Sequence, residues 1–205
     1  MAAPAASTES EKRERPGKVA MMRAAVEVMG EDGYEGASIR DMAARAGVSV
    51  AALYYHFPSK LHLLGEFLEE AHEVILARLE RRLLSADPTP TARLDVVVST
   101  IVASNLHDKF ARLASNVAVR EHTRLEKPER KVIDEKRRRL LQLVQGVIES
   151  GVENGDFATG EPREAARAII TLCSSLVEPF PEMHRSMAEV IVLYQGFARA
   201  IAATP

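Results

Sequence analysis

Side chains suited to contacting phosphates and base edges gather in one short stretch of the chain, residues 38–60. Five large residues follow one another there, from Leu53 to Phe57, and neighbouring positions of a helix point about 100° apart. One helix therefore cannot bury all five. If Leu53 and Phe57 face a core, two tyrosines and a histidine remain outside, where hydroxyl and imidazole groups are natural partners for phosphate oxygens. The alternative is that all five are core residues, but this would require the helix to be buried on every side.

Two short helices joined by a tight turn position these side chains. Ser38 begins a capping box with Asp41, and the helix that follows is predicted to end near Gly47, where glycine can adopt the left-handed conformation. Ser49 is placed to cap a second helix over 50–56. Such a pair is typical of the helix-turn-helix, whose second helix enters the major groove of DNA.

The rest of the chain has the apolar periodicity of helices and no sustained period-two alternation, which predicts an all-α fold. Further helices are expected over about 18–31, 59–84, 91–106, 109–122, 128–153, from 162, and 186–201. The division we expect is a disordered arm over 1–16, a helix-turn-helix domain over 17–60, and a larger helical domain over 61–205 for ligand binding and dimerisation.

Composition excludes several classes of protein. The net charge of −2 is mildly unusual for a DNA-binding protein, but a small contact surface can be basic on an acidic chain. The single cysteine excludes an intrachain disulfide. Residues 1–16 lack the apolar core of a signal peptide, and the longest apolar stretch, 165–177, is too short to span a bilayer. We expect a cytoplasmic protein without a membrane partner.

Motifs for catalysis or metal binding are lacking. The histidines do not show the close spacing of zinc ligands, and no glycine-rich phosphate loop, nucleophile elbow or paired-carboxylate motif occurs. We expect no catalytic residues, no metal site and no cofactor.

Gly33 to Ala43 and Ala52 to Lys60 resemble the tetracycline-repressor family of regulators, and the resemblance extends over about residues 18–65. It implies an all-helical homodimer of about nine helices that binds a near-palindromic operator in double-stranded DNA and is released by a small molecule. Two alternatives remain open: a small helical enzyme with a DNA-binding-like N-terminus, and a DNA-binding protein without an effector. Turnover assays and sequence-dependent binding distinguish them.

The resemblance also implies roles for individual residues in the 38–60 stretch. Ser38 and Arg40 are expected to contact the backbone and a base edge, and the aromatic cluster with Lys60 is expected to clamp phosphates. Small apolar residues at the start of the second helix can meet thymine methyls but cannot donate to guanine, so Arg40 should carry much of the polar base readout. The DNA-contacting residues we expect are Ser38, Arg40, Ser49, Val50, Ala51, Tyr54, Tyr55, His56 and Lys60.

Two neighbouring segments, Glu129 to Phe157 and Glu161 to Ile169, resemble the branch of the family that responds to acyl-coenzyme A or related lipid-derived ligands. A largely apolar pocket is expected, with a few polar side chains to orient the ligand. Its predicted lining is Phe67, His72, His107, Phe110, Leu113, Asn116, Leu143 and Val147. The basic run Lys136 to Arg139 is either a solvated helix face or a contact for coenzyme A phosphates.

The last two helices carry broad apolar stripes, which predicts a four-helix interface with a second copy. The interface residues we expect are Ile169, Cys173, Leu176, Ile191, Tyr194 and Ala198. The long helix that begins after Ser59 would touch the DNA-binding module through Lys60 and Leu64, and a ligand that tilts it would move the two reading helices off the groove spacing.

Overall fold

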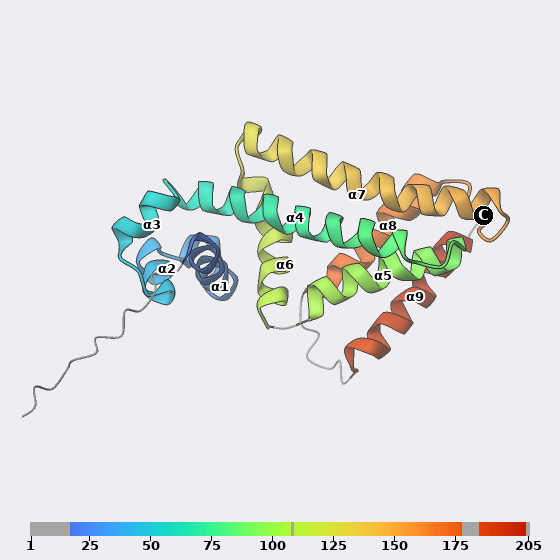
Figure 1. The fold of residues 1–205 in the computed structure, drawn as a ribbon, viewed down its shortest axis with the longest axis horizontal. Coiled ribbons are helices and arrows are strands. Elements are labelled where there is room, and N and C mark those ends of the chain that lie inside the picture. Colours follow the sequence, from blue (N-terminus) through green and yellow to red (C-terminus); the bar gives the residue numbers. More distant parts are fainter. Residues whose placement is uncertain (1–16, 108, 178–184, 204–205) are drawn as a thin grey trace, which may run out of the picture.

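We analysed a computed structural model of the chain, which describes residues 17–107, 109–177 and 185–203. The predicted arm over 1–16 lies outside the described residues. Within these ranges every regular element is helical, and the all-α prediction is confirmed (Figure 1). The elements are α1 (Lys18–Gly36), α2 (Ile39–Ala46), α3 (Val50–His56), α4 (Lys60–Leu84), α5 (Pro90–Leu106), α6 (Lys109–Glu121), η1 (His122–Arg124), α7 (Lys127–Glu153), α8 (Pro162–Ser174), η2 (Ser175–Val177) and α9 (Met187–Ala203).

The local signals for α2 and α3 act as the sequence predicts. The Ser38 hydroxyl accepts a hydrogen bond from the Asp41 amide at 3.1 Å, and the Ser49 hydroxyl accepts one from the Ala52 amide at 3.1 Å. Gly47 closes α2 with φ 68°, a conformation that a residue with a Cβ adopts only at a cost. The turn between the two helices is therefore set by local chemistry.

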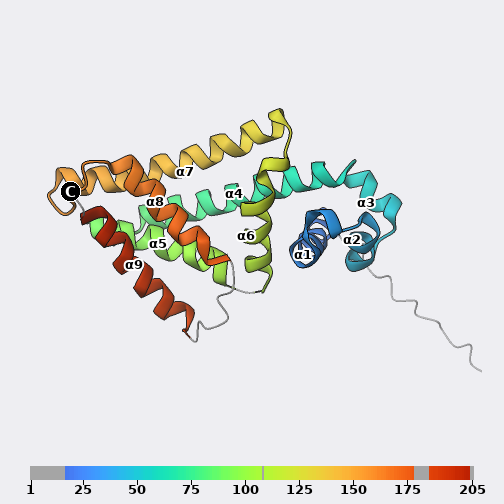
Figure 2. The same ribbon diagram turned by 180° about the vertical axis from the view of Figure 1, so that it is seen from behind.

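The helices α1, α2 and α3 form one end of the molecule, and α4 runs from that end along its length (Figure 1). Helix α7 packs beside α4, while α6 crosses between α1 and the larger group of helices. Seen from behind, α8 and α9 lie on the face away from α4 (Figure 2). We call α1, α2 and α3 together the small module. Because α1 and α6 pack closely, this module contacts the rest of the chain through α6 as well as through α4.

Two apolar cores share α4. The first joins α1 to α3 with the first half of α4, and it includes Val117 of α6 and Ile133 of α7. The second joins the later half of α4 with α5, α7, α8 and α9. Leu64 and Leu68 serve the first core and Leu79 the second, and all three are fully buried. Because burying a leucine contributes about 1.5–3 kcal/mol, α4 is held firmly at both ends.

Two further features of the structure concern membrane-spanning helices and metal sites. Among the described residues, no helix combines the length and apolar character required to cross a bilayer. No group of three or more histidine, cysteine, aspartate or glutamate side chains in the same ranges is arranged to hold a metal ion.

Candidate nucleic-acid interface and ligand cavity

The second helix of the turn motif presents two tyrosines to solvent. Leu53 and Phe57 are each 1% exposed, which confirms that they face the core. Tyr54 is 47% exposed and Tyr55 is 85% exposed, although solvent is an unfavourable place for an aromatic ring. The Tyr55 ring meets His56 edge to face at 5.2 Å between ring centroids. Among the described residues, no packing partner accounts for the aromatic character of this outer face.

Arg40 lies on the outer side of α2, exposed and without a hydrogen bond or ion pair in the described part of the chain. Val50 and Ala51 are exposed in the first turn of α3. Ser38 and Ser49 cap the two helices, so their hydroxyls are already engaged with backbone amides. The structure thus brings all these residues to one end of the molecule, and their contacts with DNA remain predictions.

Lys60 makes contacts within the protein that the sequence did not predict. Its ammonium donates hydrogen bonds to the carbonyl oxygens of Tyr34 and Ala37, the latter at 2.9 Å, and lies 4.2 Å from the centre of the Tyr34 ring. The side chain therefore joins the end of α1 to the start of α4 and uses two of the three N–H donors of its ammonium, so a contact with a phosphate through the third stays a prediction. The two carbonyl groups lie at the C-terminal end of α1, where the last carbonyls of a helix have no intrahelical partner.

A second cation, Arg124, also contacts the Tyr34 ring. The Arg124 guanidinium lies 4.9 Å from the ring centre and pairs with Glu35 at 2.5 Å and with Glu121. Burial raises the pKa of Tyr34, so its hydroxyl stays protonated. Together these contacts fix the small module to the segment that connects α6 and α7.

A cavity of about 990 Å³ lies among α1 and α4 to α8. Phe67, His72, His107 and Phe110 line it, in agreement with the predicted lining. The sequence prediction missed Met22 and its neighbours on α1, because the apolar stripe of α1 has the same spacing whether it faces a core or a cavity. Further lining residues are Val19, Arg23, Ile75, Ile101, Asn105, Ala114, Ser115, Leu140, Leu141 and Ile170.

Four predicted lining residues are wrong as cavity residues. Leu113 packs against α1, and Val147 is a buried residue of the second core, against which Leu143 packs. The wall that α7 contributes ends at Leu141, after which the same helix faces α5 and α8. Asn116, though half-buried on α6, is not part of the wall.

Positive charge dominates the polar part of the cavity wall. One carboxylate, that of Glu70, lines it together with six arginines: Arg23, Arg78, Arg137, Arg138, Arg163 and Arg167. His72 is different, because burial lowers its pKa and keeps the imidazole neutral near pH 7. Its Nδ1 donates to the Leu68 carbonyl oxygen at 2.7 Å, which leaves Nε2 as an acceptor. The wall can thus orient a mostly apolar, anionic molecule.

Helices α1 and α6 form a close contact that we call the α1–α6 seam, made by Gly30, Glu31, Lys109 and Leu113. A Cβ on Gly30 would lie 2.8 Å from the Leu113 Cβ, so glycine is needed for this approach. Glu31 accepts from Lys109 at 2.7 Å and from Arg45 of α2 at 2.8 Å. Beside the seam, the Arg23 guanidinium stacks 4.1 Å above Phe110. Phe110, which lines the cavity, therefore contacts α1 of the small module.

Most of the predicted dimer residues are wrong, because they are buried within a single chain. Ile169, Cys173 and Ala198 are 0% exposed, and Leu176 is buried with them. Burial also raises the pKa of the Cys173 thiol to about 12. Ile191 and Tyr194 are partly exposed. The large exposed apolar side chains on α9 are Met187, Val192 and Phe197.

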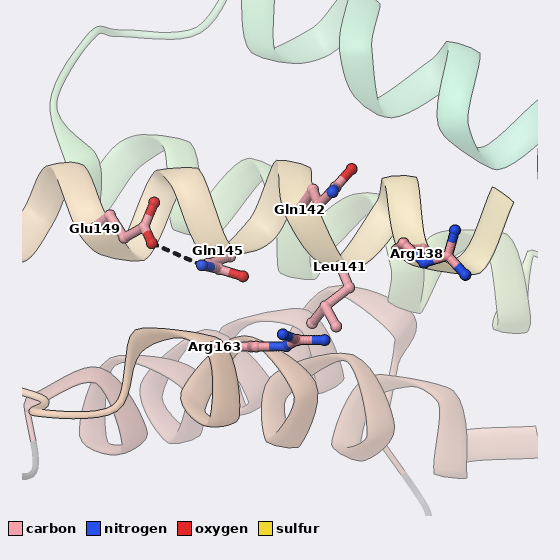
Figure 3. A pocket seen from close by; sticks show the side chains of 6 residues that line it. All are labelled: Arg138, Leu141, Gln142, Gln145, Glu149 and Arg163. Carbon is pink, nitrogen blue, oxygen red and sulfur yellow. Dashed lines mark hydrogen bonds between the residues drawn. The ribbon is translucent and has the colours of Figure 1, made fainter. Parts of the chain in front are cut away.

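A second, smaller hollow of about 390 Å³ lies between α7 and α8 (Figure 3). We call it the α7–α8 groove. Its lining is Arg138, Leu141, Gln142, Gln145, Glu149 and Arg163. The two ends of the basic run are engaged elsewhere, since Lys136 pairs with Glu73 and Arg139 with Glu80, each at 2.5 Å. The predicted role of the whole run in phosphate binding is therefore restricted to its middle.

Two family models match the chain. The model described as "Bacterial regulatory proteins, tetR family" matches residues 21–67, and "Tetracyclin repressor-like, C-terminal domain" matches residues 87–182. The first covers α2, α3 and most of the first core, and the second covers α5 to α8.

The chain is also similar to individual regulatory proteins. The fatty acid metabolism regulator protein of Bacillus subtilis is 26% identical over 159 residues, which are 78% of this chain and 80% of that protein. A tetR-family regulatory protein from Rhodococcus RHA1 superposes with a TM-score of 0.82 at 26% identity, over 92% of this chain and 99% of that one. The structure of AibR with isovaleryl coenzyme A and operator DNA has a TM-score of 0.79 at 18% identity, over 90% and 97%.

We predict that Glu31 makes the stability of the fold depend on pH. Hydrogen bonds from Lys109 and then Arg45 lower its pKa from the usual 4.5 to about 2. A lowered folded-state pKa stabilises fully above 4.5, and this contribution disappears as the pH falls through 2. Urea unfolding should therefore show Glu31→Gln to be less stable than wild type at pH 7, with the difference shrinking below pH 4.5. Glu153→Gln, at an exposed position, is the control; equal behaviour of the two variants at pH 7 would contradict the prediction.

Proposed function

Because the chain belongs to the tetR family of bacterial regulatory proteins, we propose that it is a repressor that binds an operator as a homodimer and is released by a lipid-derived effector. It acts as a regulator in the cytoplasm and not as an enzyme. The observation that carries the proposal is the pairing of an outward-facing aromatic and arginine surface on α2 and α3 with a large apolar cavity behind it.

Binding of DNA is assigned to the outer faces of α2 and α3. Helix α3 is the recognition helix, and Arg40 reaches a base edge from α2 while Tyr54 and Tyr55 contact phosphates. The exposure of these three side chains supports the assignment. Val50 and Ala51 lie over thymine methyls, because they offer no donor.

A homodimer is assigned to the outer faces of α8 and α9. A two-fold arrangement places two recognition helices about one turn of DNA, roughly 34 Å, apart and requires a near-palindromic operator. Met187, Val192 and Phe197 supply exposed apolar area on α9, and the Tyr194 and Phe197 rings pack edge to face at 5.7 Å. These side chains take the place of the buried residues that the sequence suggested.

The effector is assigned to the cavity of about 990 Å³. Cavities of that size hold drug-sized ligands, and an apolar wall with a few polar groups suits an acyl chain. Two similar proteins, a fatty acid metabolism regulator and AibR bound to isovaleryl coenzyme A, support an effector of the acyl-coenzyme A type.

Release of DNA is assigned to two routes from the cavity to α2 and α3. One is the tilt of α4, which both cores hold. The other is the α1–α6 seam, since Phe110 lines the cavity and stacks on Arg23 of α1. An effector that displaces α6 would disturb Glu31, which binds Arg45 of α2 directly. A DNA-binding protein without an effector would have no use for this cavity.

We predict that Arg40→Ala lowers discrimination at one base-pair position of the operator by about 1–3 kcal/mol, because a bidentate guanine contact is lost. Affinity for operators with single base changes, measured by fluorescence anisotropy, checks this. Arg81→Ala removes the same charge from an exposed position on α4 and serves as the control. Uniform weakening across all sequences would instead assign Arg40 to the phosphates.

We predict that Phe197→Glu converts the dimer to a monomer, since two copies of the new charge meet near the two-fold axis and like charges in an interface repel. Light scattering at micromolar concentration should report a dimer for wild type and a monomer for the variant. Val132→Glu, at an exposed position of α7, should remain dimeric. A monomeric wild-type protein would refute the assignment outright.

A further inference from the structure

The α7–α8 groove brings arginines from two helices to one hollow. Arg138 and Leu141 come from α7, and Arg163 comes from the first turn of α8 on the opposite side (Figure 3). The amide groups of Gln142 and Gln145 complete the polar wall. A planar guanidinium presents several donors in a fixed fork that matches the oxygens of phosphates and carboxylates.

The charge of these two arginines is not neutralised within the described ranges. Neither Arg138 nor Arg163 makes an ion pair or hydrogen bond there, whereas Arg139 and Arg167 each pair with a glutamate. The one carboxylate in the groove, that of Glu149, accepts a hydrogen bond from Gln145 at 2.7 Å. Two like charges held in one hollow repel, so an anion placed between them is stabilised.

The groove and the large cavity share part of their walls. Arg138, Leu141 and Arg163 line both, so one end of a single molecule can lie in the groove while the other reaches the apolar wall. A volume of about 390 Å³ is far larger than a lone carboxylate needs and falls within the range that holds drug-sized groups. Size and charge therefore favour a large head with several negative charges.

We propose that the α7–α8 groove binds the phosphorylated head of the effector, with Arg138 and Arg163 holding its phosphates, while the apolar tail occupies the large cavity. The proposal rests on the proposed function and makes it more specific. The effector is then a long acyl chain esterified to a nucleotide-sized phosphorylated carrier, and not the free acid.

Calorimetric titration with three probes tests this: palmitoyl-coenzyme A, coenzyme A alone, and palmitate. The test variant is Arg138→Gln/Arg163→Gln. The control is Arg81→Gln/Lys131→Gln, which removes the same charge at exposed positions outside the groove. Charge-assisted hydrogen bonds are the strong ones, so the test variant should bind palmitoyl-coenzyme A at least about tenfold more weakly than wild type. It should bind palmitate unchanged and lose binding of coenzyme A.

Three results would overturn the proposal: unchanged binding of palmitoyl-coenzyme A to the test variant, an equal loss of palmitate, or failure of both coenzyme A probes to bind wild type. Thermal melting of each variant shows whether it is folded. Operator binding by the wild-type protein is measured separately. A protein that binds the operator but not coenzyme A refutes the head-group site alone, and one that binds coenzyme A but no DNA refutes the proposed function.

Discussion

The approach of α1 to α6 is the constraint on which the rest of the account depends. Gly30 has no side chain, and this lets Leu113 pack directly on the backbone of α1. Glu31, one residue further, binds Lys109 of α6 and Arg45 of α2 at once. If the seam loosened, α2 and α3 would keep their own turn chemistry but lose one of the contacts that fix their position relative to the larger group of helices. Cooperative interfaces of this kind hold discrete arrangements and transmit small displacements.

The proposed DNA-binding surface and the effector cavity lie on opposite sides of the α1–α6 seam. Arg40 and the tyrosines of α3 lie on the outer side of the small module, while Phe110 lies on the cavity side of α6. A molecule in the cavity can therefore act on DNA binding without touching α2 or α3. Such coupling is reciprocal: an effector that weakens operator binding tenfold must itself bind about 1.4 kcal/mol less tightly to the DNA-bound form.

The fold could be predicted because its signals are local. Ser38, Gly47 and Ser49 mark helix ends by chemistry that acts within a few residues, and the structure bears each of them out. The site was harder, because an apolar stripe has the same spacing whether it faces a core, a cavity or a second copy. Cys173 was for this reason misplaced in the dimer interface, and the part of α1 in the cavity wall was missed.

Charged side chains could not be assigned from sequence for a different reason. Their partners lie far away along the chain, as Tyr34 does from Lys60 and Glu73 from Lys136. Only the folded chain shows which cations are already neutralised. Among the described residues, the ammonium of Lys60 is held by two carbonyl oxygens, whereas Arg138 beside the groove makes no ion pair.

The most direct test of the central claim is the effect of palmitoyl-coenzyme A on operator affinity, measured in wild type and in Leu113→Ala, with Val132→Ala as an exposed control. Coupling of typical strength should weaken operator binding by wild type and by the control at least about tenfold. In Leu113→Ala the ligand should still bind, but operator affinity should be nearly the same with and without it. An undiminished effect in Leu113→Ala would contradict the claim that the α1–α6 seam joins the cavity to the DNA-binding surface.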